Sequence, residues 1–237
     1  ECADADAMTE GDKPINSGQF FLRLGQKIRH ILDTKMLSGV LYEVDLRLRP
    51  NGDSGVLVTH IQYYEAYLRE QAWTWEQQAL VRGRFVAGDP VLKAEYEAIR
   101  TRILALPRDV TRLKQEVREM REKMRESLAN KASAVFDLKQ SRGGIADIEF
   151  IVQFGVLAQT AHDHGLATYT DNVRLLEGLA AQGFMTAEEA VLLKKAYCRY
   201  RDYGHHQVLQ GESALASEAE FAELRAQVDG LWQRFME

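Results

Sequence analysis

At 237 residues the chain is long enough to bury a sizeable core and to form one large domain or two small ones. Its net charge of −5 provides no global basic field, so composition argues against a nucleic-acid partner. No apolar run approaches the roughly 18 residues that a membrane-spanning helix needs, which argues against a membrane protein. The only cysteines, Cys2 and Cys198, lie far apart, which excludes a disulfide scaffold or zinc ribbon and fits a reducing, cytoplasmic setting.

The first part of the chain predicts a helix packed on a small sheet. Apolar residues at spacings of three and four predict a helix over about 18–33. Residues 40–48 then alternate with period two, which predicts a strand with one buried face. A Pro-Asn-Gly-Asp-Ser-Gly turn follows, and residues 56–58 are expected to form a second short extended piece.

Helix-start signals recur through the rest of the chain. The capping-box spacing occurs at Thr59 with Gln62, Thr74 with Gln77, Thr186 with Glu189 and Ser217 with Glu220. Asp89 before Pro90 also predicts a helix start, and Asp109 can cap the helix after that. These signals predict helices over about 74–87, ending at Gly88, and over about 90–106, 171–181, 187–209 and 218–236.

The helix that follows Asp109 carries a narrow apolar stripe on an otherwise charged surface. The stripe consists of Val110, Leu113, Val117, Met120, Met124 and Leu128. The charges around it have both signs: Lys114, Glu116, Arg118, Glu119, Arg121, Glu122, Lys123, Arg125 and Glu126. We interpret these charges as a solvated face with ion pairs between residues four apart.

The last predicted elements surround an apolar helix. Residues 135–139 predict a short strand or extended arm, and the Gln-Ser-Arg-Gly-Gly segment at 140–144 ends it. Residues 145–158 are apolar nearly all round, which predicts a central, buried helix. The expected fold class is therefore mainly α with a small β portion: a small α/β piece over 1–88, then a helical bundle over 89–237.

One face of the predicted strand is unusual, because Glu43, Asp45, Arg47 and Arg49 follow one another along it. A carboxylate between guanidiniums could serve a metal-bound phosphate, with Asp45 on Mg²⁺ and the arginines on phosphate oxygens. The turn would let the backbone approach such a ligand through Gly52, Ser54 and Gly55. The alternative is a solvated strand face beside an ordinary hairpin turn, and spacing alone leaves both interpretations open.

A second candidate lies at the start of the apolar helix. Gly143 and Gly144 precede it, and Asp147 and Glu149 lie in its first turns. Early carboxylates complement the helix dipole, which is a structural interpretation. Two carboxylates on a buried helix are costly, however, so a domain junction or substrate site is the alternative. At a spacing of two residues, the two side chains are expected to point in different directions.

Four segments in order carry a resemblance to a known family: YEVDLRLRPNGDSGVLV, AWTWEQQALVRGR, LKQEVREMREKM and FDLKQSRGGIADIEFIVQF. They resemble the glutamine synthetase adenylyltransferase family, whose members are bifunctional adenylyltransferase and adenylyl-removing enzymes with two similar halves. The second and third segments look like the C-terminal, adenylylating half. The bundle from about residue 89 resembles the helical domain that follows the nucleotidyltransferase in this family and in the uridylyltransferases of nitrogen signalling.

The resemblance implies a nucleotidyltransferase that uses ATP and Mg²⁺ to transfer AMP to a tyrosine of glutamine synthetase. It further implies the signal protein PII as a partner and glutamine as an effector. Asp45 matches the third catalytic carboxylate of the family and its metal-ligand position. The family's Gly-Ser and Asp-x-Asp motifs are not found in a matching context, so the first domain is expected to be truncated. The isolated chain is therefore expected to be catalytically deficient, and a helical binding module or the deadenylylating half remain alternatives.

Overall fold

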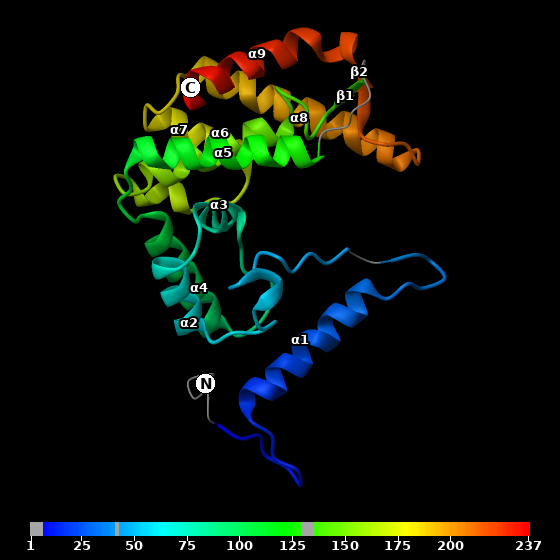
Figure 1. Cartoon of the computed structure of the whole chain (residues 1–237), viewed down its shortest axis with the longest axis vertical. Coiled ribbons are helices and arrows are strands. Elements are labelled where there is room, and N and C mark those ends of the chain that lie inside the picture. The colour runs from blue at the N-terminus through cyan, green and yellow to red at the C-terminus, as the bar shows by residue number, and fades with distance from the viewer. Residues whose placement is uncertain (1–6, 41–42, 129–134) are drawn as a thin grey trace. The chain divides into compact units, whose positions relative to one another are not determined.

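The computed structural model describes residues 7–40, 43–128 and 135–237, and the chain divides into two compact units (Figure 1). Unit 1 comprises Glu1–Glu76 and Gly88–Tyr96, and unit 2 comprises Gln77–Ala87 and Glu97–Glu237. The chain therefore passes from one unit to the other after residues 76, 87 and 96. The domain boundary after residue 88 stays a prediction.

Unit 1 begins with helix α1 (Ser17–Asp33), which confirms the predicted first helix. The Asn16 side chain accepts a hydrogen bond from the Gly18 amide and caps it. The apolar stripe is present, but no residue of α1 is buried. Its large apolar side chains are 43 to 58% exposed at Phe20, Leu24, Ile28 and Ile31. The periodicity therefore predicted the helix correctly, whereas its apolar face is covered only in part, with Leu57 and Val58 close to it at Gly25.

The predicted sheet over 40–58 is wrong for the described residues. Residues 43–49 and 56–58 form no strand, and residues 41 and 42 lie outside the described residues. Side chains here bond to nearby backbone, with Asp45 accepting from the Arg47 amide and Arg49 donating to the Leu46 carbonyl. Such local bonds compete with strand pairing, and the described residues offer this segment no neighbouring strand to pair with.

The small β portion lies elsewhere, in unit 2. Strand β1 (Val135–Asp137) pairs antiparallel with β2 (Leu215–Ser217), with Phe136 opposite Ala216. The short strand predicted at 135–139 is confirmed, although its partner was not predicted. The chain is thus mainly α with a small β portion, as expected.

Helix α2 (Ile61–Glu70) departs slightly from its predicted cap. His60 replaces Thr59 as the cap, with its Nδ1 accepting from the Gln62 amide at 3.2 Å, so this prediction was wrong by one residue. At the start of α3 (Thr74–Arg82), Glu76 accepts from the Trp73 amide at 2.8 Å. The predicted pairing of Thr74 with Gln77 stays a prediction.

Helix α3 also ends before the predicted Gly88. The guanidinium of Arg100 donates to the carbonyl oxygens of Leu80 at 3.0 Å and Val81 at 2.6 Å. It also donates to the carbonyl oxygens of Ala167 and Tyr169. A buried arginine from another helix therefore satisfies carbonyls in the last turn of α3, which a local sequence signal does not reveal.

The next two helices begin where the sequence predicted. Asp89 accepts from the Val91 amide at 2.7 Å and caps α4 (Pro90–Leu104). Asp109 accepts from the Thr111 amide at 2.9 Å and caps α5 (Val110–Leu128). Between them, Arg108 donates to the carbonyls at the end of α4, and burial lowers the pKa of its guanidinium to about 10.

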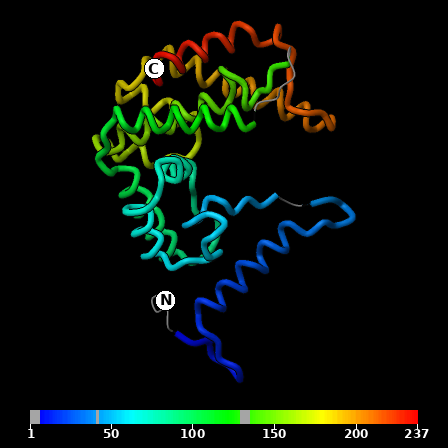
Figure 2. The backbone as a smooth tube through the Cα atoms, viewed as in Figure 1, coloured from blue at the N-terminus to red at the C-terminus, as the bar shows by residue number. Residues whose placement is uncertain are grey.

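Unit 2 is built around α6 (Ile145–Gln159), which is buried along most of its length as predicted. Helices α5, α7 (Asn172–Ala181), α8 (Ala187–Leu209) and α9 (Glu218–Met236) pack against it, as does the 3₁₀ turn η2 (His164–Ala167). Figure 2 traces this path through the bundle. The capping box at Thr186 and Glu189 is confirmed, whereas Ser217 makes no side-chain cap. None of the described helices has both the length and the apolar character to cross a membrane.

Candidate functional site

Asp45 lies in an irregular loop of unit 1 and is held by a neighbour two residues away. The Arg47 guanidinium donates to both carboxylate oxygens, from Nε to Oδ1 at 3.0 Å and from Nη2 to Oδ2 at 2.7 Å. The Arg47 amide adds a third bond to Oδ1 at 2.9 Å. These hydrogen bonds lower the pKa of the Asp45 carboxyl from 3.8 to about 2, because they stabilise its charged form. Both side chains are more than half exposed.

Arg49 and the turn after it hold the loop together through hydrogen bonds to its own backbone. Arg49 donates to the carbonyl oxygens of Leu46 at 2.7 Å and Gly55 at 3.4 Å, and its side chain is only 20% exposed. Ser54 Oγ donates to the Asn51 carbonyl at 2.7 Å within the 3₁₀ turn η1 (Gly52–Ser54). A Cβ at position 55 would collide with the Pro50 carbonyl, so glycine is required there.

The ligand-binding roles predicted for these residues stay predictions. Arg47, Arg49, Gly52, Ser54 and Gly55 lie within one loop with Asp45, but most of their polar groups already have partners in that loop. Nowhere in residues 7–40, 43–128 and 135–237 do three His, Cys, Asp or Glu side chains gather as metal ligands. The described residues therefore do not fit a complete Mg²⁺ site, because Asp45 is a single carboxylate already held by Arg47.

Asp147 occupies the opposite environment, at the centre of unit 2. Its side chain is fully buried, and its Oδ1 accepts from Arg121 Nε at 2.7 Å and Arg125 Nη2 at 2.8 Å. Its Oδ2 accepts from the Gly143 amide at 2.7 Å. We call Asp147, Arg121 and Arg125 the buried triad. The triad joins α5 to the start of α6 and to the glycine turn before it.

The solvated-face interpretation of the α5 charges is therefore wrong for Arg121 and Arg125. Both residues are buried, and burial lowers the pKa of the Arg121 guanidinium, while Asp147 opposes that effect. A signal for this was present in the sequence. Steps of four residues from Leu113 and Val117 lead to Arg121 and Arg125, so the buried face of α5 continues through the two arginines.

Gly143 and Gly144 are required by the turn that places Asp147. Gly143 has φ of +74°, and a Cβ there would collide with the Arg225 carbonyl. A Cβ on Gly144 would lie 2.8 Å from the Leu138 carbonyl oxygen. The Arg225 guanidinium also donates to the Arg142 carbonyl at 2.9 Å, so α9 fixes the turn from outside. The possible role of these glycines at a domain junction or substrate site stays a prediction.

Glu149 belongs to a different network from Asp147, as their spacing predicted. Its Oε1 accepts from Arg82 Nη1 at 2.5 Å and from Asn172 Nδ2 at 3.4 Å. One turn further along α6, Gln153 Oε1 accepts from Gln78 Nε2 at 3.1 Å. The first turns of α6 thus present one carboxylate to α5 and another to α3 and α7.

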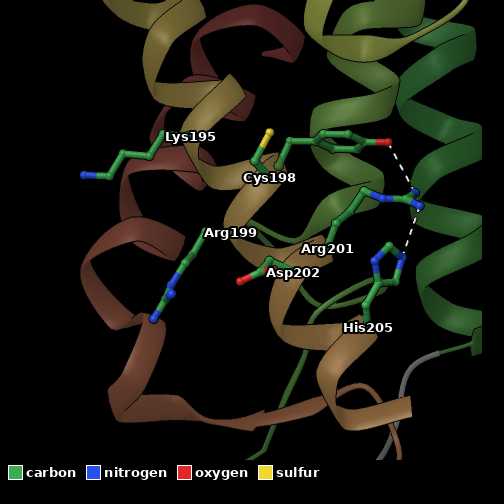
Figure 3. Close-up of a pocket in the computed structure, with 7 residues that line it drawn as sticks. Lys195, Cys198, Arg199, Arg201, Asp202 and His205 are labelled. Carbon is green, nitrogen blue, oxygen red and sulfur yellow. Dashed lines mark hydrogen bonds between the residues drawn. The ribbon is translucent and has the colours of Figure 1, made fainter. Parts of the chain in front are cut away.

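An open hollow of about 660 Å³ lies along α8 and contains none of the predicted site residues. Arg201 contacts the Tyr197 hydroxyl at 3.4 Å and the His205 ring at 3.3 Å. Figure 3 shows Arg201 pointing toward His205, whereas Lys195 and Arg199 extend away from it. The hollow is a basic stretch of helix surface and shares no residue with the loop around Asp45.

Comparison with known proteins matches the two parts of the chain to two family models. A model described as glutamate-ammonia ligase adenylyltransferase matches residues 1–99. A model described as GlnD PII-uridylyltransferase matches residues 111–214. The second match agrees with the resemblance that the helical part shows to uridylyltransferases.

Curated relatives match the chain nearly end to end. All three described here are named bifunctional glutamine synthetase adenylyltransferase/adenylyl-removing enzyme. The protein of Methylococcus capsulatus is 50% identical over 98% of this chain and that of Nitrosococcus oceani 51% over 98%. The Pseudomonas putida protein is 46% identical over 97%. The chain spans only 24 to 25% of the length of these relatives. By sequence, the chain belongs to the glutamine synthetase adenylyltransferase family and corresponds to about a quarter of the length of these members.

Proposed function

We propose that this chain is part of an ATP- and Mg²⁺-dependent enzyme that transfers AMP to a tyrosine of glutamine synthetase in the cytoplasm. The observation that carries the proposal is the identity of about half the residues to named glutamine synthetase adenylyltransferases over nearly the whole chain. PII and glutamine would be the protein partner and the effector of the complete enzyme.

Asp45 is the residue that we propose to act in transfer. Its pKa of about 2 keeps the carboxylate charged at any physiological pH, which a metal ligand requires. Arg47 would have to release one carboxylate oxygen for this role, and it could then contact a phosphate. The described residues provide one such carboxylate, so we propose that the remaining metal ligands belong to other parts of the longer protein.

The test uses the full-length protein with glutamine synthetase, Mg²⁺ and labelled ATP. Asp45→Asn should abolish AMP transfer while leaving the removal of AMP intact. Glu70→Gln, an exposed acidic residue at the end of α2 in the same unit, is the matched control and should retain both activities. If Asp45→Asn loses only removal, the chain belongs to the deadenylylating half.

The 237-residue chain alone should transfer AMP no faster than background. A single carboxylate cannot hold the metal ions that neutralise a triphosphate. Transfer at a rate comparable to the full-length enzyme would contradict this expectation.

A second candidate function is a helical module that docks glutamine synthetase or PII. The match of residues 111–214 to a PII-uridylyltransferase model favours it. Affinity measurements with the isolated chain separate the two functions: tight binding to either protein without turnover supports the docking module, and absence of binding contradicts it.

A further inference from the structure

One face of helix α8 is left uncovered by every described element. The helix packs on α6, α7 and α9 through its other faces, where it buries Leu193, Tyr197 and Tyr200. The exposed residues recur at spacings of three and four from one end of the helix to the other, so they lie in one line along it. We call these residues the outer face of α8: Val191, Lys195, Cys198, Asp202, His205 and Leu209.

The middle of the outer face is basic, although the chain has a net charge of −5. Lys195 lies on this face, Arg199 and Arg201 flank it, and all three are exposed. Within the described residues none of the three forms an ion pair with a carboxylate, whereas the neighbouring Lys194 is paired with Glu177 at 2.6 Å. The three cations are therefore available to the carboxylates of another molecule.

The two ends of the outer face are apolar. Val191 is 64% exposed near the start of α8 and Leu209 is 84% exposed at its end, where Val208 beside it is 62% exposed. At a rise of about 1.5 Å per residue, roughly 27 Å separate the two ends. Exposed apolar side chains together with arginines are typical of protein–protein interfaces.

The spread of the charges argues against a small ligand. Lys195 and Arg199 extend away from Arg201 and His205, so the cations that line the hollow do not converge on one point (Figure 3). A nucleic acid fits poorly as well, because Asp202 lies on the same face with its side chain 63% exposed and would repel phosphates. The outer face therefore suits a long partner whose charge varies along its length.

Charge also argues against a second copy of this chain as the partner. The residues of the outer face are spaced symmetrically about Tyr200. An antiparallel copy would therefore place Arg199 opposite Arg201, and Lys195 opposite His205. Like charges brought together across an interface cost free energy. The complement of this face is instead acidic in its middle and apolar at both ends.

We propose that the outer face of α8 docks an acidic amphipathic helix of a partner protein. Carboxylates of that helix would accept from Lys195, Arg199 and Arg201, and its apolar side chains would cover Val191 and Leu209. The outer face shares no residue with the loop proposed to act in transfer. This inference therefore holds or fails independently of AMP transfer, and of whether glutamine synthetase or PII is the partner.

Cys198 makes occupancy of this face measurable, because its exposed thiol lies at the centre of the outer face. In the 237-residue chain, Cys2→Ser leaves Cys198 as the one thiol. The probe is a fluorescein-labelled synthetic helix of about 20 residues, with leucines at both ends and glutamates between them. Fluorescence anisotropy should show binding, and the bound peptide should slow the reaction of Cys198 with a maleimide. Raising the salt from about 0.1 M to about 1 M should weaken binding, because it shortens the Debye length from about 10 Å to about 3 Å.

Arg199→Gln combined with Arg201→Gln should weaken peptide binding about tenfold, because two ion pairs are lost. The matched control is Arg112→Gln, since Arg112 is an exposed arginine on α5 in the same unit, and it should leave binding unchanged. Circular dichroism should show each variant folded. The proposal is overturned if the peptide does not bind, if the bound peptide leaves the maleimide reaction unchanged, or if the double variant and the control bind it equally well. Equal binding of single-stranded DNA of the same charge would also overturn it, because the face would then select any polyanion.

Discussion

The two units contain the same pair of chemical groups in opposite environments. In unit 1, Asp45 is held by Arg47 at the surface, with both side chains more than half exposed. In unit 2, Asp147 is held by Arg121 and Arg125 in a fully buried position. Water can replace Arg47 as the partner of Asp45, whereas nothing can replace the arginines around Asp147. The first pair is therefore free to exchange partners, and the second is fixed by its surroundings.

Apolar side chains show the same difference. Helix α1 has an apolar stripe but no buried residue, whereas α6 is buried along most of its length. A stripe is enough to make a helix amphipathic, but burial depends on what other elements cover it. We infer that unit 2 supplies most of the stability of this chain, while unit 1 contains the loop proposed to act in transfer.

The largest expected effect follows from removing the carboxylate of the buried triad. Asp147→Ala leaves two buried guanidiniums without their anion and should lower the free energy of unfolding by about 3–5 kcal/mol. The matched change, Asp45→Ala, should have a much smaller effect on stability, because solvent screens the exposed pair. Urea denaturation followed by circular dichroism measures both. Equal losses for the two variants would contradict the comparison between the units.

A second pair of variants compares the apolar faces. Ile151 in α6 is 0% exposed, and Ile28 in α1 is 51% exposed. Ile151→Ala should destabilise the protein by about 2–5 kcal/mol, because it leaves a cavity in a packed core. Ile28→Ala should change the free energy of unfolding by less than about 0.5 kcal/mol. If the Ile28 variant is as unstable as the Ile151 variant, then α1 is covered in solution.

The third comparison lies within unit 2 and concerns the turn before Asp147. Gly143 and Gly211 both have positive φ, at +74° and +80°, but only Gly143 has close neighbours. Gly211→Ala should cost about 1 kcal/mol for backbone strain alone. Gly143→Ala should cost more, about 2–3 kcal/mol, because its Cβ also collides with the Arg225 carbonyl. Thermal unfolding monitored by circular dichroism measures the stability lost in each variant. Equal losses would show that α9 shifts to make room for the Cβ at position 143.

Features set by neighbouring residues could be predicted from the sequence. The caps at Asp89, Asp109 and Thr186 act within one turn of their helices, and each was predicted correctly. The sequence of residues 145–158 is apolar on nearly all sides of the helix, which likewise predicted that α6 is buried. These are local signals, because the partner atoms lie only a few residues away.

Features set by residues far apart in the sequence could not be predicted from it. The end of α3 depends on Arg100, the strand β1 on its distant partner β2, and the position of Asp147 on Arg121 and Arg125. The predicted strand through Asp45 failed for the same reason. Alternation shows that a segment could be a strand, but pairing requires another segment, and the loop's own arginines bond to its backbone instead.

The smallest effect concerns the ionisation of Asp45 and tests the surface pair directly. Its pKa of about 2 lies below the ordinary 3.8, so pairing with Arg47 stabilises the folded loop above pH 3.8. That stabilisation should disappear as the pH falls from about 3.8 to about 2, because the carboxylate then takes up a proton. Carbon-detected NMR of the Asp45 carboxyl measures the midpoint.

Arg47→Ala should raise the Asp45 midpoint toward 3.8, since the guanidinium bonds are the largest cause of the shift, while the backbone amide of residue 47 still donates to the carboxylate. Arg29→Ala, which removes the partner of Asp33 in the same unit, should leave the Asp45 midpoint unchanged. High salt should also raise the midpoint, because exposed charges are screened. A midpoint near 2 in Arg47→Ala would mean that another cation holds Asp45, and the surface pair would not be the exchangeable contact that a metal ligand needs.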